Sequence, residues 1–303
     1  MKLVSLVLLT MAEACAQTPA VAPYPPPGKM VDLGGYRVHL NCTGQGSPAV
    51  MIVGGFSFDW SLVQPEVAAF TRVCTYDLSG TAWSDPGPGR GCPAWVHEVY
   101  GLFAHTEAEG PYVLVGLSAE AVVARLVASE HPDEVAGIVM VDHAFLPGAA
   151  GATPARVQAE SAASGDSPPS LIFQTPVVFS HEDEPGFKNL PKAAQLLDQW
   201  ASSRNPDLPT AETTGHCIEA AETAARGKAH PLGNLPLVVV STANDSAGYS
   251  ELQSHLLSLS SDTVQRVATR SFHSVEISEP GVVIGAIREV VDAVRNHSRV
   301  RAH

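Results

Sequence analysis

The stretch that decides the fold is residues 113–123, VLVGLSAEAVV. It begins as an apolar run typical of a strand, ends that run at Gly116, and continues after Ser118 with helical periodicity as far as Pro132. A serine between a strand and a helix, in a G-x-S-x context, indicates the sharp turn that presents a nucleophilic hydroxyl. Two places after such a serine a small residue is usual, but here the residue is Glu120.

Strand-like and helical segments alternate along the rest of the chain. The final helix is predicted from a stripe of apolar residues starting at Val283, with Ser278 and Pro280 as start signals. Several strands are apolar almost throughout, as strands buried on both faces of a parallel sheet are. We therefore predict an α/β fold with a doubly wound, mostly parallel sheet of about eight strands. The predicted strands are 36–41, 49–53, 72–76, 112–115, 135–141, 237–240 and 264–268.

One connection is too long for a loop. About 90 residues separate Val141 from Leu237, whereas loops in compact domains usually have a few residues. Within it, the spacing of Ala193, Leu197 and Trp200 predicts a helix, and AETTGHCIEAAETAARG (residues 211–227) reads as a second one. We expect an inserted helical cap over residues 144–234. The core is then residues 29–143 and 235–296, followed by a tail at 297–303.

Composition excludes some classes of partner. The 303 residues carry a formal net charge of −13, with 45% hydrophobic and 16% charged residues. This composition supports a large buried core, and the acidic balance argues against nucleic acid and anionic membranes as partners. No segment after the N-terminus is long and apolar enough to predict a transmembrane helix.

The N-terminus indicates export. MKLVSLVLLTMAEACAQ has one Lys, a short apolar run and small residues before a cleavage site after Ala16, so residues 1–16 are predicted to be a signal peptide. Lipid attachment at Cys15 is the alternative, although Ala12 stands where lipoprotein signals prefer Leu. Residues 17–28 form a Pro-rich lead-in. The localisation expected is periplasmic or extracellular.

Four cysteines remain in the predicted mature chain: Cys42, Cys74, Cys92 and Cys217. In an exported protein this number indicates two disulfides, and the sequence leaves three connectivities open. Four buried free thiols are the alternative if the chain is not exported. None of these cysteines shows C-x-x-C spacing, so the sequence does not predict a redox motif or a zinc site.

A serine hydroxyl needs a base, a carboxylate that orients this base, and donors for the oxyanion. The chain offers Ser118, then Asp245 after the strand 237–240, then His273 between the last strand and the last helix. All three follow the carboxyl ends of strands, where ligands gather in open α/β sheets. Asp142, which ends IVMVD, is the rival acid; its alternative role is to cap the turn after its strand.

These segments together resemble the α/β-hydrolase fold superfamily, and in particular its bacterial hydrolases with a helical cap. The likeness runs from about Val31 to Arg295. The segments that carry it are GGYRVHLNCTGQGSPAVMIVGG, FTRVCTYDLSGTAWSDPGP, GPYVLVGLSAE, PLVVVSTAND and SFHSVEISEPGVVIGAIREVV. The resemblance implies Ser118 as nucleophile, His273 as base and Asp245 as acid. It also implies backbone oxyanion donors at Ala119 and Phe56.

The resemblance also implies the disulfide pairing. In this fold the second and fourth strands are neighbours, which would bring Cys42 to Cys74. Cys92 would then pair with Cys217 and tether the cap to the core.

Three positions depart from the family's pattern: Gly54 stands where His is frequent, Phe272 where Gly is frequent, and Glu120 where a small residue is usual. None of them removes a triad side chain. A carboxylate in the first turn of a helix is favoured by the helix dipole, but a charge in a packed place needs a partner. We expect either a widened gap with water or a hydrogen-bond partner for Glu120.

Other side chains are candidates for the substrate pocket. Trp60, His143 and Phe145 join Glu120 as possible lining residues, although ordinary packing would also account for the two aromatic ones. HEDE at residues 181–184 lacks the spacing that puts ligands on one helix face, so we read it as a solvated loop and expect no metal and no organic cofactor.

The function implied by the resemblance is hydrolysis of a carboxylic ester through an acyl-enzyme, on a small-molecule substrate. Hydrolysis of an amide, lactone or small peptide by the same triad is one alternative. A non-catalytic binding protein with this fold is the other, for which the three departures argue.

Overall fold

The structure is a computed structural model and describes residues 22–143, 181–183, 185–204, 210–243, 247–271 and 273–300. Its centre is an eight-stranded sheet with the order β1-β2-β4-β3-β5-β6-β7-β8. The strands β1 and β2 are antiparallel to each other, β2 is antiparallel to β4, and every later pair is parallel. This confirms the predicted fold class. The strands are β1 (Lys29–Asp32), β2 (Arg37–Thr43), β3 (Val50–Val53), β4 (Val73–Tyr76), β5 (Tyr112–Leu117), β6 (Val135–Val141), β7 (Leu237–Thr242) and β8 (Thr263–Ala268).

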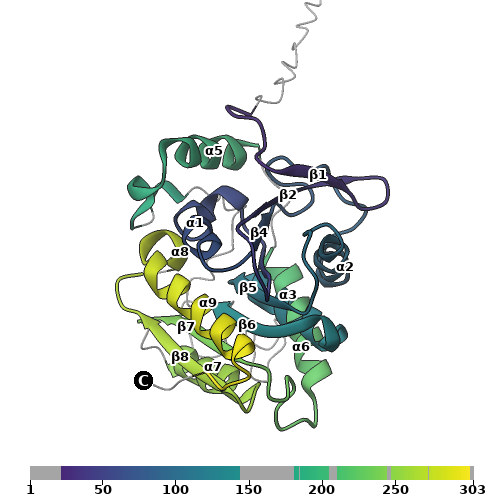
Figure 1. The fold of residues 1–303 in the computed structure, drawn as a ribbon, viewed down its shortest axis with the longest axis vertical. Coiled ribbons are helices and arrows are strands. Elements are labelled where there is room, and N and C mark those ends of the chain that lie inside the picture. The colour runs from purple at the N-terminus through teal and green to yellow at the C-terminus, as the bar shows by residue number, and fades with distance from the viewer. Residues whose placement is uncertain are drawn as a thin grey trace, which may run out of the picture.

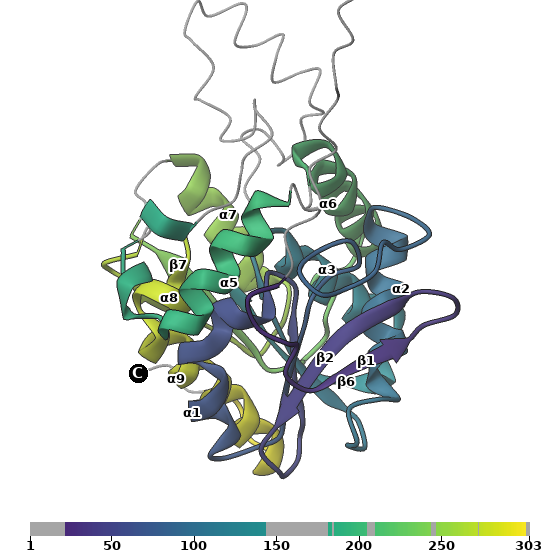
Figure 2. The same cartoon turned by 90° about the horizontal axis from the view of Figure 1, so that it is seen from above.

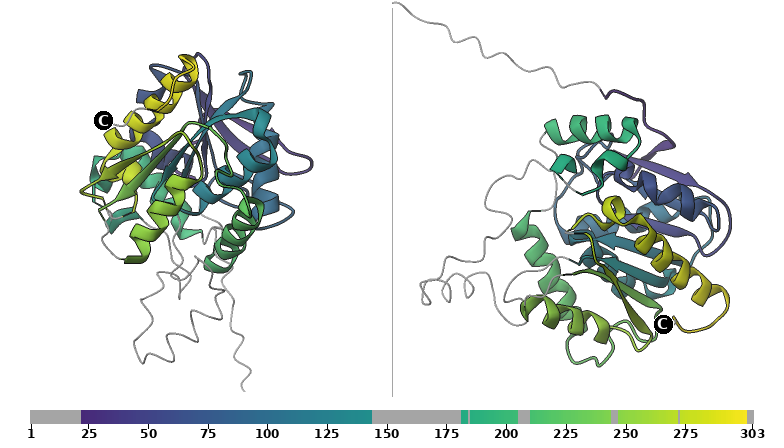
Figure 3. Two further views of the ribbon diagram at one scale, coloured as in Figure 1. Left: turned by 90° about the horizontal axis from the view of Figure 1, so that it is seen from below. Right: turned by 90° about the vertical axis from the view of Figure 1, so that its left-hand side faces the viewer.

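Helices cover both faces of the sheet. Figures 1 and 2 show α1 (Gln64–Ala68), α8 (Val275–Ser278) and α9 (Pro280–Arg295) on one side. On the other side lie α2 (Cys92–Phe103), α3 (Ala119–Glu130), α6 (Ala211–Ala225) and α7 (Ala247–Ser258). Figure 3 shows the twisted sheet between these two layers. The short helices are η1 (Ser57–Leu62), η2 (Pro132–Glu134), η3 (His181–Asp183) and η4 (Phe187–Asn189), and α5 is Lys192–Ser203.

The apolar strands make two cores because successive side chains point to opposite faces. On β3, Met51 and Val53 pack with α2 and α3, whereas Val50 and Ile52 pack with α1 and α9. The stripe predicted for the last helix, including Val283 and Ile287, is buried in the second core. Burying a Val, Leu or Ile side chain contributes about 1.5–3 kcal/mol, so the two cores together stabilise the sheet from both faces.

Both helices predicted inside the long connection are present, as α5 and α6. Residues 144–180 lie outside the described part of the chain, and so does the predicted signal peptide; the cap and the domain boundaries therefore stay predictions. Among the described residues, no helix has the length and the apolar character needed to cross a bilayer.

Both disulfides pair as the resemblance implied. Cys42–Cys74 joins facing residues of β2 and β4, and Cys92–Cys217 joins the start of α2 to α6. The second bridge ties a helix of the predicted cap range to the core across 125 residues of chain. Two disulfides favour an oxidising compartment.

Candidate active site

Ser118 occupies a strained turn between β5 and α3. Its backbone has φ +55° and ψ −119°, a left-handed conformation that side chains rarely adopt. Gly116 permits this turn, because a Cβ there would lie 2.6 Å from backbone atoms of Ala121 and Glu120. Such strain persists where the surroundings enforce it, and it often marks functional residues. The turn lifts Ser118 above the carboxyl end of the sheet, as we predicted from its strand-to-helix position.

His273 is hydrogen-bonded to a carboxylate. Its Nδ1 lies 2.6 Å from Oδ2 of Asp142, at the end of β6, and the imidazole itself is partly exposed. The structure thus brings His273, the expected base, together with Asp142, which was predicted as the rival acid. Asp245, the acid expected from the resemblance, lies outside the described residues, so its placement is untested.

Ser118 and Asp142 are neighbours through the sheet. The register pairs Leu117 with Val141, and the Ser118 N–H donates to the Val141 carbonyl at 2.9 Å. Asp142 follows directly with φ +37°. Ser118 at the end of β5 therefore lies beside Asp142 at the end of β6, and the Asp142 carboxylate binds His273.

Two residues that sequence reasoning missed hold Asp142 in place. Tyr249 on α7 donates its hydroxyl to Asp142 Oδ1 at 2.9 Å, and Thr242 at the end of β7 donates to the same oxygen at 3.2 Å. Burial, and then the charge of Asp142, raise the pKa of Tyr249 to about 12, so its phenol stays a donor. Oδ1 is thereby occupied and Oδ2 is left for His273. Of these two residues, only Thr242 could have been suspected from the sequence, because it lies at the end of a strand.

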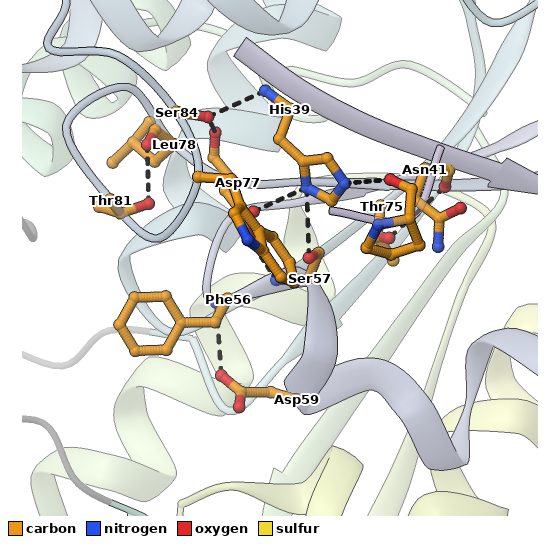
Figure 4. A network of polar contacts seen from close by, with 12 residues as sticks. His39, Asn41, Phe56, Ser57, Asp59, Thr75, Asp77, Leu78, Thr81 and Ser84 are labelled. Atoms are coloured by element: carbon orange, nitrogen blue, oxygen red, sulfur yellow. Dashed lines mark hydrogen bonds and ion pairs between the residues drawn. The ribbon is translucent and has the colours of Figure 1, made fainter. Parts of the chain in front are cut away.

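The loop that follows β3, residues 54–57, carries one expected oxyanion donor and is fixed by a buried network (Figure 4). The Ser57 N–H donates to Asp77 Oδ1 at 2.7 Å, and Asp77 Oδ2 accepts from His39 Nδ1 at 2.7 Å. Burial alone would lower the pKa of His39, but the hydrogen bond and charge of Asp77 outweigh it, and the pKa is raised. This second His–Asp–Ser group is buried away from solvent, so it serves to anchor the loop.

The expected oxyanion donors differ in their partners. Ala119 is the first residue of α3, so its N–H belongs to the four that a helix leaves without an intrahelical acceptor. The Phe56 N–H instead points to Asp59 Oδ2 at a long 3.3 Å. Both donor assignments stay predictions.

Glu120 fits against the same loop because Gly54 has no side chain. A Cβ on Gly54 would overlap Cγ of Glu120 and lie 2.7 Å from its Cβ and Cδ. Burial raises the pKa of Glu120 to about 7, against the lowering effects of its own N–H, of His273 and of Gly55. The expectation of a hydrogen-bond partner or a widened gap for Glu120 stays a prediction.

The remaining pocket candidates differ in placement. Trp60 is 1% exposed and packs in the core beside α1 and α9, which favours the packing alternative. His143 is buried directly after Asp142. Phe145 lies outside the described residues.

The reading of residues 181–184 as a solvated loop is wrong for His181. Its Nδ1 lies 2.7 Å from Oδ1 of the buried Asp198 on α5 and 3.7 Å from Asp59 Oδ1 on η1. Burial alone would lower the pKa of His181, but the charges of Asp59 and Asp198 raise it to about 10. In the described part of the chain these three side chains are the group that could hold a metal ion, with ligand atoms within 4.8 Å of one another. Burial raises the pKa of Asp59 well above its usual value, and the charges of Asp198 and Glu276 add to this against the opposing charge of His181. The close ion pair of His181 is therefore the one with Asp198.

This His181 cluster lies at a junction. It links η3 and α5, both within the predicted cap range, to η1, which follows β3 and the loop expected to carry an oxyanion donor. Figure 2 shows α5 lying close to α1, the helix that follows η1 in the chain. The cluster therefore fixes this helical segment next to the candidate site.

Sequence comparisons give partial matches. No family model matches the chain. It is 31% identical over 124 residues to 2-hydroxymuconate semialdehyde hydrolase from Pseudomonas sp. strain CF600, covering 39% of this chain and 44% of that protein. It is 39% identical over 84 residues to an uncharacterized protein of Schizosaccharomyces pombe, covering 26% of this chain and 15% of that protein. The chain thus spans less than half the length of each of these curated relatives.

Solved structures resemble the whole fold. An esterase from Thermogutta terrifontis has a TM-score of 0.60 at 22% identity, covering 88% of this chain and 99% of that one. A putative epoxide hydrolase from Pseudomonas aeruginosa has a TM-score of 0.63 at 15% identity, covering 88% and 96%. Est816, described as an N-acyl homoserine lactone degrading enzyme, has a TM-score of 0.58 at 16% identity, covering 86% and 99%. At these identities the likeness establishes a shared fold.

Proposed function

We propose that this chain, which has the α/β-hydrolase fold, is a serine hydrolase that cleaves carboxylic esters through an acyl-enzyme. The observation that carries the proposal is the pairing of His273 with Asp142 beside the strained Ser118 turn. A His held through Nδ1 by a carboxylate keeps Nε2 for proton exchange with the nucleophile.

In the proposed reaction, Ser118 Oγ attacks the ester carbonyl while His273 accepts the hydroxyl proton. The negative charge on the carbonyl oxygen is stabilised by backbone N–H groups, first that of Ala119 at the start of α3. His273 then protonates the leaving alcohol, and the acyl group stays on Ser118. Water, deprotonated by His273, releases the acid and restores the serine.

The 2.6 Å hydrogen bond supports Asp142 as the acid that orients His273. Asp245 remains the assignment implied by the resemblance, and the two make different predictions that can be measured. The two disulfides support export of the protein, and the signal peptide at residues 1–16 and a small-molecule ester substrate belong to the same proposal.

The test is covalent labelling with a fluorophosphonate probe, followed by peptide mapping, together with a screen of chromogenic esters of graded chain length. We expect label on Ser118, and loss of both labelling and turnover in Ser118→Ala. Ser57→Ala is the matched control, because Ser57 lies in the buried His39–Asp77 network. Well-folded protein that takes up no label would favour the binding-protein alternative, and label on Ser57 would refute the site.

A further inference from the structure

The His181 cluster, which consists of His181, Asp59 and Asp198, takes its side chains from three separate elements. His181 lies on η3, Asp198 on α5 and Asp59 on η1. One ligand atom from each residue lies within 4.8 Å of the other two, and both aspartates are buried. A search for ligand spacing on one helix could not find this group, because each element contributes a single side chain. The three side chains nevertheless meet at one point.

One oxygen of the cluster has no hydrogen-bond donor. Asp59 is 3% exposed, and its Oδ1 lies 3.7 Å from His181 Nδ1, which is too far for a hydrogen bond. No other described residue donates to this oxygen. The second oxygen, Oδ2, accepts from the Phe56 N–H at 3.3 Å (Figure 4). Asp59 therefore directs a buried carboxylate oxygen into the cluster, and such an oxygen is costly unless a proton or an ion meets it.

The cluster has two carboxylates and one group that can carry a positive charge. His181 Nδ1 pairs with Asp198 Oδ1 at 2.7 Å, and the His181 backbone N–H points to Asp198 Oδ2 at 3.4 Å. Among the described residues, no Lys or Arg forms a salt bridge with Asp59 or Asp198. One imidazolium balances one carboxylate, whereas a divalent cation beside a neutral imidazole would balance both.

We infer that the His181 cluster is a binding site for a divalent cation of the zinc type, held by His181 Nδ1, Asp198 Oδ1 and Asp59 Oδ1. One imidazole nitrogen and two carboxylate oxygens are ligands that Zn²⁺ accepts. Ca²⁺ takes roughly six to eight oxygen ligands, so this donor set does not suit it. On binding, the cation replaces the proton at His181 Nδ1, and that proton is released to solvent.

The distances suit such a site. Zn²⁺ binds His nitrogen and Asp oxygen at about 2.0–2.2 Å, so two ligand atoms of a tetrahedral ion lie about 3.4 Å apart. The distances of 2.7 Å and 3.7 Å from His181 Nδ1 to the two carboxylates lie on either side of this value. Movements of about 1 Å or less by each ligand atom would therefore form the site, with water as a fourth ligand.

A cation in this place would join two parts of the chain. η3 and α5 fall within the predicted cap range, whereas η1 follows β3 of the core. An ion that binds only the folded chain stabilises it by mass action. The inference does not depend on the proposed function, because no side chain of the cluster belongs to the proposed triad.

The experiment uses the full chain without a polyhistidine tag, after treatment with a chelator and dialysis. Zn²⁺ alone is the probe, and its binding is measured by titration calorimetry and by the melting temperature. His181→Gln removes the nitrogen ligand, and Asp59→Asn removes one charge at nearly constant shape. His255→Gln is the matched control, because His255 Nε2 lies 3.0 Å from Glu222 Oε1 in a His–carboxylate pair outside the cluster.

For the wild type we expect one Zn²⁺ per chain and a rise in melting temperature of at least about 3 °C with zinc in excess. His255→Gln should keep both. In His181→Gln and Asp59→Asn the affinity should be at least about tenfold weaker, since loss of a residue that only supports a metal ligand already costs about 10–100-fold. Mg²⁺ and Ca²⁺ should give no comparable rise.

A wild type that takes up no stoichiometric Zn²⁺ would overturn the inference. Equally tight zinc binding by His181→Gln and Asp59→Asn would do the same. If one of these two variants fails to fold, the other decides. Ser118→Ala should bind Zn²⁺ as the wild type does. A chain that binds zinc but takes up no fluorophosphonate overturns only the proposed function, and a chain that labels but does not bind zinc overturns only this inference.

Discussion

Replacing Asp142 by asparagine isolates the role of its charge while keeping its contacts. The introduced amide would keep a carbonyl Oδ1 that accepts from Tyr249 and Thr242, and these two donors orient the amide. Its NH₂ group then takes the place of Oδ2, 2.6 Å from His273 Nδ1. A donor facing that nitrogen favours the tautomer with the proton on Nε2, which cannot accept the proton of Ser118.

The expected loss in kcat for Asp142→Asn is on the order of 10⁴-fold, as when the wrong tautomer is imposed in other triads. That factor corresponds to about 5.5 kcal/mol in the activation barrier. The assay is hydrolysis of a short-chain chromogenic ester, together with the labelling rate of Ser118. Melting temperature controls for folding, because loss of a hydrogen bond to a charged group also costs about 1.5–3 kcal/mol of stability.

Asp245→Asn is the matched control, since it makes the same chemical change at the acid that the resemblance implied. If Asp142 orients the base, Asp245→Asn should keep kcat within about tenfold, or about 1.4 kcal/mol. The reverse result, in which Asp245→Asn is the inactive variant and Asp142→Asn is active, would show that the 2.6 Å contact does not serve catalysis.

Two further predictions concern stability. Replacing Cys92 and Cys217 by Ser should lower the free energy of unfolding by about 5 kcal/mol, which is the chain-entropy value for a loop closed over 125 residues. Urea unfolding measures this change. A change below about 1 kcal/mol would mean that the disulfide does not constrain the unfolded chain. His181 has a raised pKa of about 10, so its contribution to stability is fully present below its unfolded pKa of about 6.5 and is lost as pH rises through about 10. Relative to His181→Gln, the free energy of unfolding of the wild type should therefore fall by about 3 kcal/mol between pH 7 and pH 10, as measured by thermal or urea unfolding. If the free energies of the two proteins change in parallel with pH, the charged pair with Asp198 is contradicted.

Most of the fold could be predicted because its signals are local. The seven predicted strands are present, and the strand Val135–Val141 has the predicted bounds. A continuous apolar run needs both faces of a sheet covered, so this pattern alone indicates a parallel arrangement. Strand β1 was missed: KMVD has four residues, of which Val31 alone is buried, too few to show an alternation.

The candidate site was only partly predictable, since its contacts join segments far apart in the chain. Ser118 and His273 stand in strand-to-helix contexts that the sequence shows directly. The partner of His273 depends on which strand end lies nearest, and β6 and β7 are neighbours in the sheet. Both Asp142 and Asp245 follow these strands, so only the Asp142–His273 contact favours one of them. Tyr249 carries no motif at all, and its role becomes visible only through its hydroxyl on Asp142.

Taken singly, Gly54 and Glu120 are two departures from the resembled pattern, and each argues for a disabled enzyme. In space they are one feature, since the side chain missing at Gly54 is the room that Glu120 fills. A large residue at both positions would clash, and a glycine at both would leave a gap between the loop and the Ser118 turn, which well-packed proteins avoid. The matched volumes of Gly54 and Glu120 keep the loop packed on the turn, as the packing of any protein requires. Neither residue, once seen as part of this pair, argues by itself for a disabled nucleophile turn, and labelling of Ser118 decides whether the turn works.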